Sequence, residues 1–181
     1  MKILNIYYSS TGNTRKVAET ITKTLKEMEQ SVDVIEVKEK EDISVDLLEY
    51  DLIFAGSGVY QWLPGRPIQE LFTRLLWKYF EKGEIKPSAP RRGKKAVIYC
   101  TYGGAHTGIN EAIPAVKYMG QLFDHLGFDI IAEWYIVGEY RTEKLKRFSE
   151  EGRMGNIKGR PDEKDLKDIS EKVKGIIKAL K

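Results

Sequence analysis

Apolar and polar positions follow one another along this chain in blocks that predict strands and helices in turn. Residues 3–8 are apolar or aromatic almost throughout, as expected for a strand buried on both faces. Residues 52–56 and 96–101 have the same buried character, and residues 130–137 form a last strand. Residues 32–37 alternate between apolar and polar side chains, which is typical of an edge strand. The pattern therefore predicts five strands.

Four helices are predicted around these strands. Apolar residues recur at helical spacing at 17–28, 68–79, 116–126 and 166–180. Strands that are joined through helices run parallel, and right-handed crossovers place the helices on both faces of the sheet. We expect an α/β fold of the doubly wound, three-layer sandwich type, with a five-stranded parallel sheet in the order 2-1-3-4-5. Ligands of such sheets bind beyond the carboxyl ends of the strands where the chain switches direction.

The length of 181 residues and the 41% of hydrophobic residues suit one domain, so we expect residues 1–181 to form a single unit. Residues 138–161 are polar and irregular, with a short helical candidate at 143–151. This segment starts at the end of the last strand and contains Tyr140, Arg141 and Phe148. It either covers a site at that edge or is a surface excursion, and the second interpretation is favoured because long irregular segments are only sometimes functional.

Composition narrows the classes of function. The 30 basic and 27 acidic side chains leave a net charge of +3, which is not typical of a nucleic-acid-binding protein. The single cysteine, Cys100, permits no internal disulfide and no Cys/His cluster, which indicates a reducing compartment, the cytoplasm, and argues against a metal site. No stretch approaches the roughly 18 consecutive apolar residues of a membrane span, so none is expected.

The most informative polar run follows the first strand. It consists of Ser9, Ser10, Thr11, Gly12, Asn13 and Thr14. Small hydroxyl residues and a glycine can wrap a phosphate, and the free N–H groups at the following helix start stabilise its charge. The run lacks the G-x-G-x-x-G pattern of dinucleotide sites and the G-K-[ST] ending of triphosphate loops. The alternative is a simple turn with a helix N-cap, which favours the same residue types.

This run resembles the phosphate loop of the flavodoxin family, whose pattern is [ST]-x-T-G-x-T. Ser9, Thr11, Gly12 and Thr14 match the pattern position for position. The resemblance implies that the sandwich is flavodoxin-like and that its cofactor is FMN. It further implies that the run binds the FMN phosphate, with Gly12 letting the backbone approach.

A second loop at the same edge is implicated by the resemblance. Its candidate cofactor-binding residues are Ser57, Gly58, Val59, Tyr60, Gln61 and Trp62. In the family a residue of this loop stacks on the isoalloxazine ring, and Tyr60 or Trp62 suits that role. An aromatic side chain there excludes water and so lowers the reduction potential. The alternative is that both aromatics only anchor the loop.

A third loop follows the strand at 96–101 and matches the family's other ring-contacting loop in location. Its candidate cofactor-binding residues are Thr101, Tyr102, Gly103, Gly104 and His106. The glycines expose backbone groups to ring atoms. His106 either lies near the flavin, where it tunes it or relays a proton, or is an exposed loop residue. The loop has no acidic residue, unlike many short-chain flavodoxins, and a Tyr-Gly-Gly run also occurs in quinone-reducing relatives.

No nucleophile, acid–base pair or metal cluster stands out in the sequence, so we assign no catalytic residue. The leading hypothesis is an FMN-binding electron carrier between redox partner proteins. An FMN-dependent oxidoreductase that passes electrons from NAD(P)H to a quinone or another small acceptor is the alternative, because the net charge fits poorly with the acidic surfaces of well-known flavodoxins. The third hypothesis is a binding module that has lost the flavin, since the fold alone does not decide among these functions.

Overall fold

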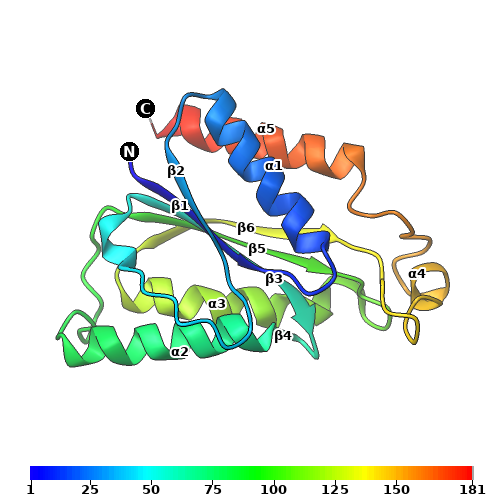
Figure 1. Cartoon of the computed structure of the whole chain (residues 1–181), viewed down its shortest axis with the longest axis horizontal. Helices are drawn as coiled ribbons and strands as arrows, with labels where there is room; N and C mark the ends of the chain where they lie inside the picture. The colour runs from blue at the N-terminus through cyan, green and yellow to red at the C-terminus, as the bar shows by residue number, and fades with distance from the viewer. Residues whose placement is uncertain (181) are drawn as a thin grey trace.

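A twisted parallel sheet forms the middle layer of the computed structural model, which describes residues 1–180 (Figure 1). Its five main strands are β1 (Ile3–Tyr8), β2 (Val32–Glu36), β3 (Leu52–Tyr60), β5 (Lys95–Tyr102) and β6 (Asp129–Val137). They pair in parallel in the order β2-β1-β3-β5-β6. The predicted order 2-1-3-4-5 is thereby confirmed, since β5 and β6 take the fourth and fifth places.

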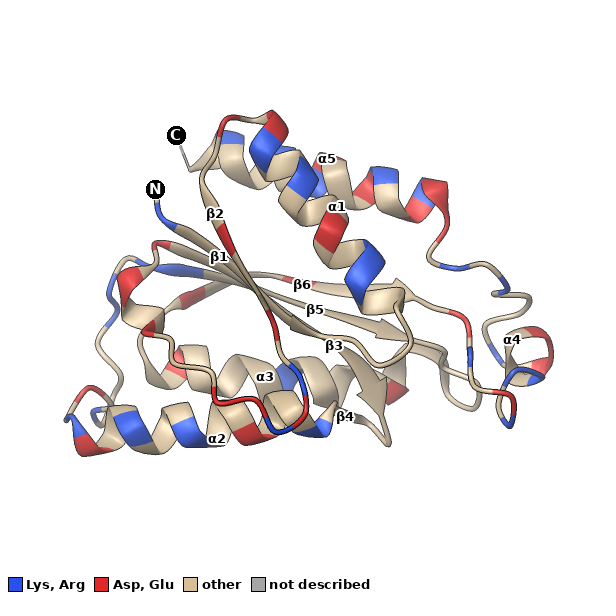
Figure 2. Ribbon diagram, in the orientation of Figure 1, with Lys and Arg blue, Asp and Glu red and all other residues tan. Residues whose placement is uncertain are grey.

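Helices cover both faces of this sheet (Figure 1). One face packs against α1 (Asn13–Glu27) and α5 (Glu163–Ala179), and the other against α2 (Arg66–Glu81) and α3 (Ile113–His125). None of the helices in the described part of the chain is both long and apolar enough to cross a membrane. Figure 2 shows that the basic and acidic residues of these helices are interspersed, so neither layer presents a face of one charge.

The pleat of β1 explains why the core has two halves. Leu4 and Ile6 point into the layer of α2 and α3, whereas Ile3 and Tyr7 point toward α1 and α5. All four side chains are buried, as expected for a strand that is apolar at nearly every position. Burying each such side chain stabilises the fold by about 1.5–3 kcal/mol.

A polar residue, Asn5, is fully buried in the middle of β1. Its Nδ2 donates hydrogen bonds to the Ala18 carbonyl oxygen (2.9 Å) and to Thr22 Oγ1 (3.0 Å), and its Oδ1 accepts one from the Tyr99 hydroxyl (3.0 Å). The Tyr99 ring lies across Gly56, where a Cβ atom would fall 2.1 Å from it. This network ties β1, β5 and α1 together, and no residue pattern predicted it.

Several boundaries differ from the predictions. The third strand continues to Tyr60 and turns back through the two-residue strand β4 (Leu63–Pro64), which pairs antiparallel with it. The helix predicted at 143–151 is confined to α4 (Phe148–Glu151), because the preceding residues form turns. The last helix, α5, starts at Glu163, because Asp162 and Asp165 form a capping box in front of the apolar run.

We expect Tyr99→Phe to lower the free energy of unfolding by about 1–3 kcal/mol, because Asn5 Oδ1 would then be buried without a donor. Urea unfolding followed by circular dichroism measures this change. Tyr135→Phe is the matched control: its hydroxyl donates to Glu133 at a partly exposed position, so its cost should stay below about 1 kcal/mol. Equal effects of the two substitutions would contradict a stabilising role of the buried network.

Candidate functional site

A cleft of about 430 Å³ opens at the carboxyl edge of the sheet, beside the ends of β1, β3, β5 and β6. It brings together all the predicted site residues except Gly12 and Ser57. The predicted residues that line it are Ser9, Ser10, Thr11, Asn13, Thr14, Gly58, Val59, Tyr60, Gln61, Trp62, Thr101, Tyr102, Gly103, Gly104 and His106. Three loops far apart in the sequence thus share one cavity.

The first loop presents backbone donors at the start of α1. Gly12 lies at the N-cap with φ of 94°, and as a glycine it has no side chain that could cap the helix. Ser9 Oγ accepts hydrogen bonds from the N–H groups of Gly12 and Arg15, each 3.2 Å long. Within residues 1–180, the N–H groups of Thr11, Asn13 and Thr14 have no hydrogen-bond acceptor. Unpaired donors at the positive end of a helix dipole form a site for an anion.

Asn13 lines this cleft and has an unpartnered buried polar atom. Its side chain is only 7% exposed, and its Nδ2 donates to the Glu139 carbonyl oxygen at 2.8 Å. In the described part of the chain, Asn13 Oδ1 is the buried side-chain nitrogen or oxygen atom that lacks a hydrogen-bond partner. Buried polar atoms normally have a partner, so a hydroxyl group of a ligand would complete this one.

The second loop is a tight hairpin between β3 and β4. Its two turn residues, Gln61 and Trp62, have φ of 48° and 69°, values that such turns usually reserve for Gly and Asn. This strained backbone holds Trp62, which is 62% exposed, at the rim of the cleft. Tyr60 also lines the cleft, and its hydroxyl shares a hydrogen bond of 2.6 Å with Ser10 Oγ.

Ser57 does not take part in the cleft, contrary to the prediction. Its side chain is fully buried, and its Oγ donates to the Gly58 carbonyl oxygen and accepts from the Gly65 N–H, both at 2.9 Å. Ser57 therefore closes the base of the hairpin. Gly12 also does not line the cleft, but its backbone turns the chain into α1 beside it.

The third loop is tied to the first through a buried bond. Thr101 Oγ1 and Thr14 Oγ1 lie 2.8 Å apart, so the two loops hold each other in place. Glu111 fixes the far end of the third loop by accepting from the N–H groups of His106 and Thr107 at 2.6 and 2.7 Å. The His106 ring is exposed and lies against Phe148, with ring centroids 5.6 Å apart.

The segment of residues 138–161 forms a wall of the cleft, so the favoured interpretation as a mere surface excursion is wrong. The cleft residues missed by the sequence-based list are Glu111, Gly138, Glu139, Tyr140, Arg141, Thr142, Leu145 and Phe148. Tyr140 Oη accepts from the Ala105 N–H at 3.2 Å, and a Cβ atom on Gly103 would lie 2.2 Å from the Tyr140 ring. Their position directly after β6 could have indicated that these residues line the cleft, because the carboxyl end of β6 lies at the same edge of the sheet.

Burial raises the pKa of the Tyr102 and Tyr140 phenols above the usual value. Both hydroxyls are therefore protonated at neutral pH and add no charge to the cleft. Within residues 1–180, no three His, Cys, Asp or Glu side chains are placed to hold a metal ion.

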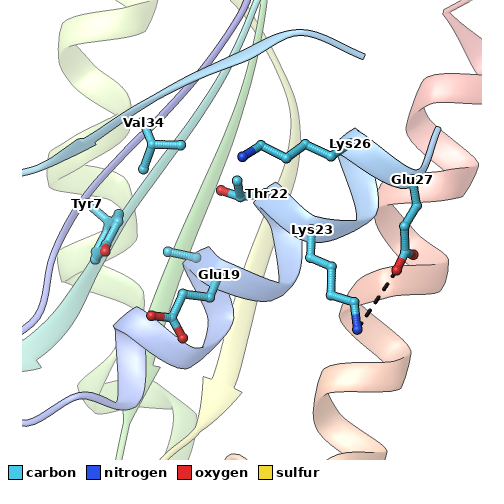
Figure 3. A pocket seen from close by; sticks show the side chains of 8 residues that line it. Tyr7, Glu19, Thr22, Lys23, Lys26, Glu27 and Val34 are labelled. Carbon is cyan, nitrogen blue, oxygen red and sulfur yellow. Dashed lines mark ion pairs between the residues drawn. The ribbon is translucent and has the colours of Figure 1, made fainter. Parts of the chain in front are cut away.

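A second groove, of about 540 Å³, lies between α1 and β2 (Figure 3). Its side chains include Tyr7, Thr22 and Val34, with the ion pair of Lys23 and Glu27 at one end, 3.8 Å long. None of the predicted site residues lines this groove. The cleft at the carboxyl edge is therefore the better candidate.

Comparison with known proteins agrees with this geometry. Residues 4–79 match a family model described as a flavodoxin domain. The chain has a flavodoxin-like fold. A flavodoxin-like domain-containing protein of Clostridioides difficile (strain CD3), BilS, is 41% identical over 59 residues. This alignment covers 33% of the present chain and 32% of BilS, so it spans about a third of the length of that curated relative.

Solved structures show the same fold along the whole chain. The crystal structure of oxidised flavodoxin 2 from Bacillus cereus superposes with a TM-score of 0.67 and 18% identity, covering 99% of each chain. A short-chain flavodoxin associated with a non-canonical PDU bacterial microcompartment gives a TM-score of 0.66 and 16% identity, covering 100% of this chain and 99% of that one. The predicted flavodoxin-like fold is confirmed.

We expect Gly103→Ala to loosen the flavodoxin-like cleft, because the new methyl group would overlap the Tyr140 ring. Such overpacking should lower the free energy of unfolding by about 1–3 kcal/mol and speed trypsin cleavage within residues 138–161. Gly175→Ala in α5 is the control, since its Cβ would meet open space and a helix-interior alanine should stabilise by about 0.5–1 kcal/mol. Unchanged cleavage of the Gly103→Ala protein would contradict the role of this contact.

Proposed function

We propose that this chain binds one FMN in the cleft and carries electrons between redox partner proteins. The observation that supports the proposal most directly is the meeting of two features in one cavity. Unpaired N–H groups at the start of α1 suit a phosphate. The amide oxygen Asn13 Oδ1 in the same residue run can accept a hydrogen bond from a hydroxyl group, which suits a polyol. FMN carries both groups on one chain, followed by a flat ring.

The residues of the cleft fit such a ligand in kind and in size. The phosphate would lie against the N–H groups of Thr11, Asn13 and Thr14, and ribityl hydroxyls would donate to Asn13 Oδ1. Aromatic walls for the ring are offered by Tyr60 and Trp62. The volume of about 430 Å³ lies within the range of about 300–1,000 Å³ that is usual for cofactor sites.

When bound, FMN supplies the electron transfer, which no side chain of the cleft can perform. The contribution of this chain is to hold the cofactor and to control water around it. Tyr102 and Tyr140 add no negative charge to the cleft, which is also lined by Glu111, Glu139 and Arg141. Uncharged aromatic side chains that exclude water from a reduced ring disfavour its charged form and so lower its potential.

The arrangement of side chains supports a carrier over an enzyme. The carboxylate of Glu111 is already engaged by two backbone N–H groups, and the His106 ring is exposed against Phe148. Neither is paired with a second titratable side chain, as acid–base catalysis usually requires.

One observation favours the second candidate, an FMN-dependent NAD(P)H:acceptor oxidoreductase. Residues 138–161 contain seven basic and four acidic side chains, and the part of this segment between Gly138 and Phe148 lines the cleft. A surplus of positive charge on a segment next to the cleft would attract anionic small molecules such as NADPH.

An anaerobic titration of the FMN-loaded protein, followed by visible absorption, tests the proposal. A carrier should resist NADPH and accept electrons from dithionite in two separate one-electron steps. Direct bleaching of the flavin bands by NADPH would instead support the oxidoreductase. Failure to take up added FMN would contradict both and favour a binding module without flavin.

We expect Thr14→Val to weaken FMN binding about 10-fold, because it removes a hydroxyl beside the phosphate loop and breaks the bond to Thr101. Quenching of FMN fluorescence during titration of the flavin-free protein measures the affinity. Thr20→Val is the matched control on the same helix, since the Thr20 hydroxyl donates to the Lys16 carbonyl oxygen and does not line the cleft. Unchanged FMN affinity of the Thr14→Val protein would count against the assigned loop.

A further inference from the structure

We propose that Arg141 recognises the phosphate of the cofactor and makes this cleft select FMN over riboflavin. The inference rests on the proposed binding of FMN and adds a residue that lies outside the phosphate loop, 130 positions from Thr11 in the sequence.

The guanidinium of Arg141 lies on the backbone of the phosphate loop. Its Nη1 donates to the Thr11 carbonyl oxygen at 3.2 Å, and it lies 3.3 Å from the point where Gly12 would carry a Cβ atom. Arg141 also lines the cleft beside Asn13 and Thr11. Arg141 and the residues that carry the unpaired N–H groups of the loop therefore line the same cleft.

The charges at the part of the cleft next to the start of α1 favour binding of an anion. The N-terminal end of α1 carries a positive partial charge, and the first turn of this helix contains no acidic residue to balance it. Arg141 adds a positive charge at the same end, and the carboxylate of Glu139 pairs with one side of its guanidinium. A phosphate dianion would accept charge-assisted hydrogen bonds from the other side of the guanidinium and further bonds from the loop N–H groups.

Glu139 holds the guanidinium in this place. Glu139 Oε1 accepts from Arg141 Nε at 3.0 Å, and Glu139 Oε2 accepts from the Gly159 N–H at 2.8 Å. The backbone of Glu139 is fixed too, because its N–H donates to the Arg160 carbonyl oxygen at 2.9 Å. In the described part of the chain Arg141 Nη2 has no partner, so one edge of the fork remains for a phosphate oxygen.

A second observation points independently to a ligand at this corner. Asn13 Nδ2 donates to the Glu139 carbonyl oxygen, while Asn13 Oδ1 stays buried without a partner. The same residue, Glu139, thus positions Asn13 through its backbone and Arg141 through its carboxylate. A ligand that bridges Asn13 and Arg141 would fasten residues 139–141 to the phosphate loop, so binding should also protect the segment that follows.

The discriminating experiment compares FMN and riboflavin, which differ only in the phosphate. Isothermal titration of the flavin-free protein gives both affinities for the unmodified chain, for Arg141→Gln and for Arg141→Lys. We expect Arg141→Gln to weaken FMN binding about 10- to 100-fold and to leave riboflavin binding within about 2-fold. The FMN affinity of Arg141→Lys should lie between those of the unmodified chain and Arg141→Gln, because lysine keeps the positive charge but lacks the planar guanidinium with its paired donors.

Lys144→Gln is the matched control, since it removes one positive charge from the same segment at an exposed side chain that does not line the cleft. Its FMN affinity should not change. As a second readout, FMN should slow trypsin cleavage within residues 138–161 of the unmodified chain, and riboflavin should do so less.

Equal weakening of FMN and riboflavin by Arg141→Gln, or no weakening of either, would overturn the role of Arg141 while leaving the proposed FMN site intact. Tight binding of riboflavin and FMN alike by the unmodified chain would also overturn it. If the unmodified chain binds neither flavin, the proposed function fails and this inference fails with it. Thermal unfolding of the flavin-free variants identifies any that do not fold, and Arg141→Lys then decides the outcome.

Discussion

The register of the parallel strands is the constraint on which the site depends. Tyr8 pairs with Ser57, Gly58 with Thr101, and Thr101 with Ile136, so β1, β3, β5 and β6 end at nearly the same level. Because parallel strands all point the same way, each of these ends releases its loop on one side of the molecule. The cleft is the space that these loops enclose.

The loops are then held in place by a small number of polar bonds. Thr14 to Thr101 joins the first loop to the third, Tyr60 to Ser10 joins the second to the first, and Asn13 to Glu139 attaches the segment after β6. Of these, the bond between the two threonines is fully buried and therefore costly to break. The rigid sheet below and these cross-links above keep the donors of the cleft in position before a ligand arrives.

The charge distribution of the site differs from that of its first loop alone. That loop contains no charged residue, and an anion there would depend on backbone N–H groups and the helix dipole. The segment after β6 adds Arg141 and Glu139 to the cleft, and the segment as a whole has a surplus of basic residues. Its ion pairs Lys146–Glu143 and Lys158–Glu150 are exposed, so they contribute little to stability.

The sequence by itself determined the order of the strands and helices and the residues of the first loop at the cleft. Hydrophobic periodicity is a local signal, and right-handed crossovers leave few ways to arrange the elements that it predicts. Only the tertiary structure decided that Ser57 is buried under a hairpin, that Gln61 and Trp62 take left-handed backbone angles, and that Arg141 lies on the first loop. Each of these depends on a side chain or turn meeting distant residues. The Asn13 to Glu139 bond spans 126 positions, and residues 138–161 have no apolar period that would reveal where they pack.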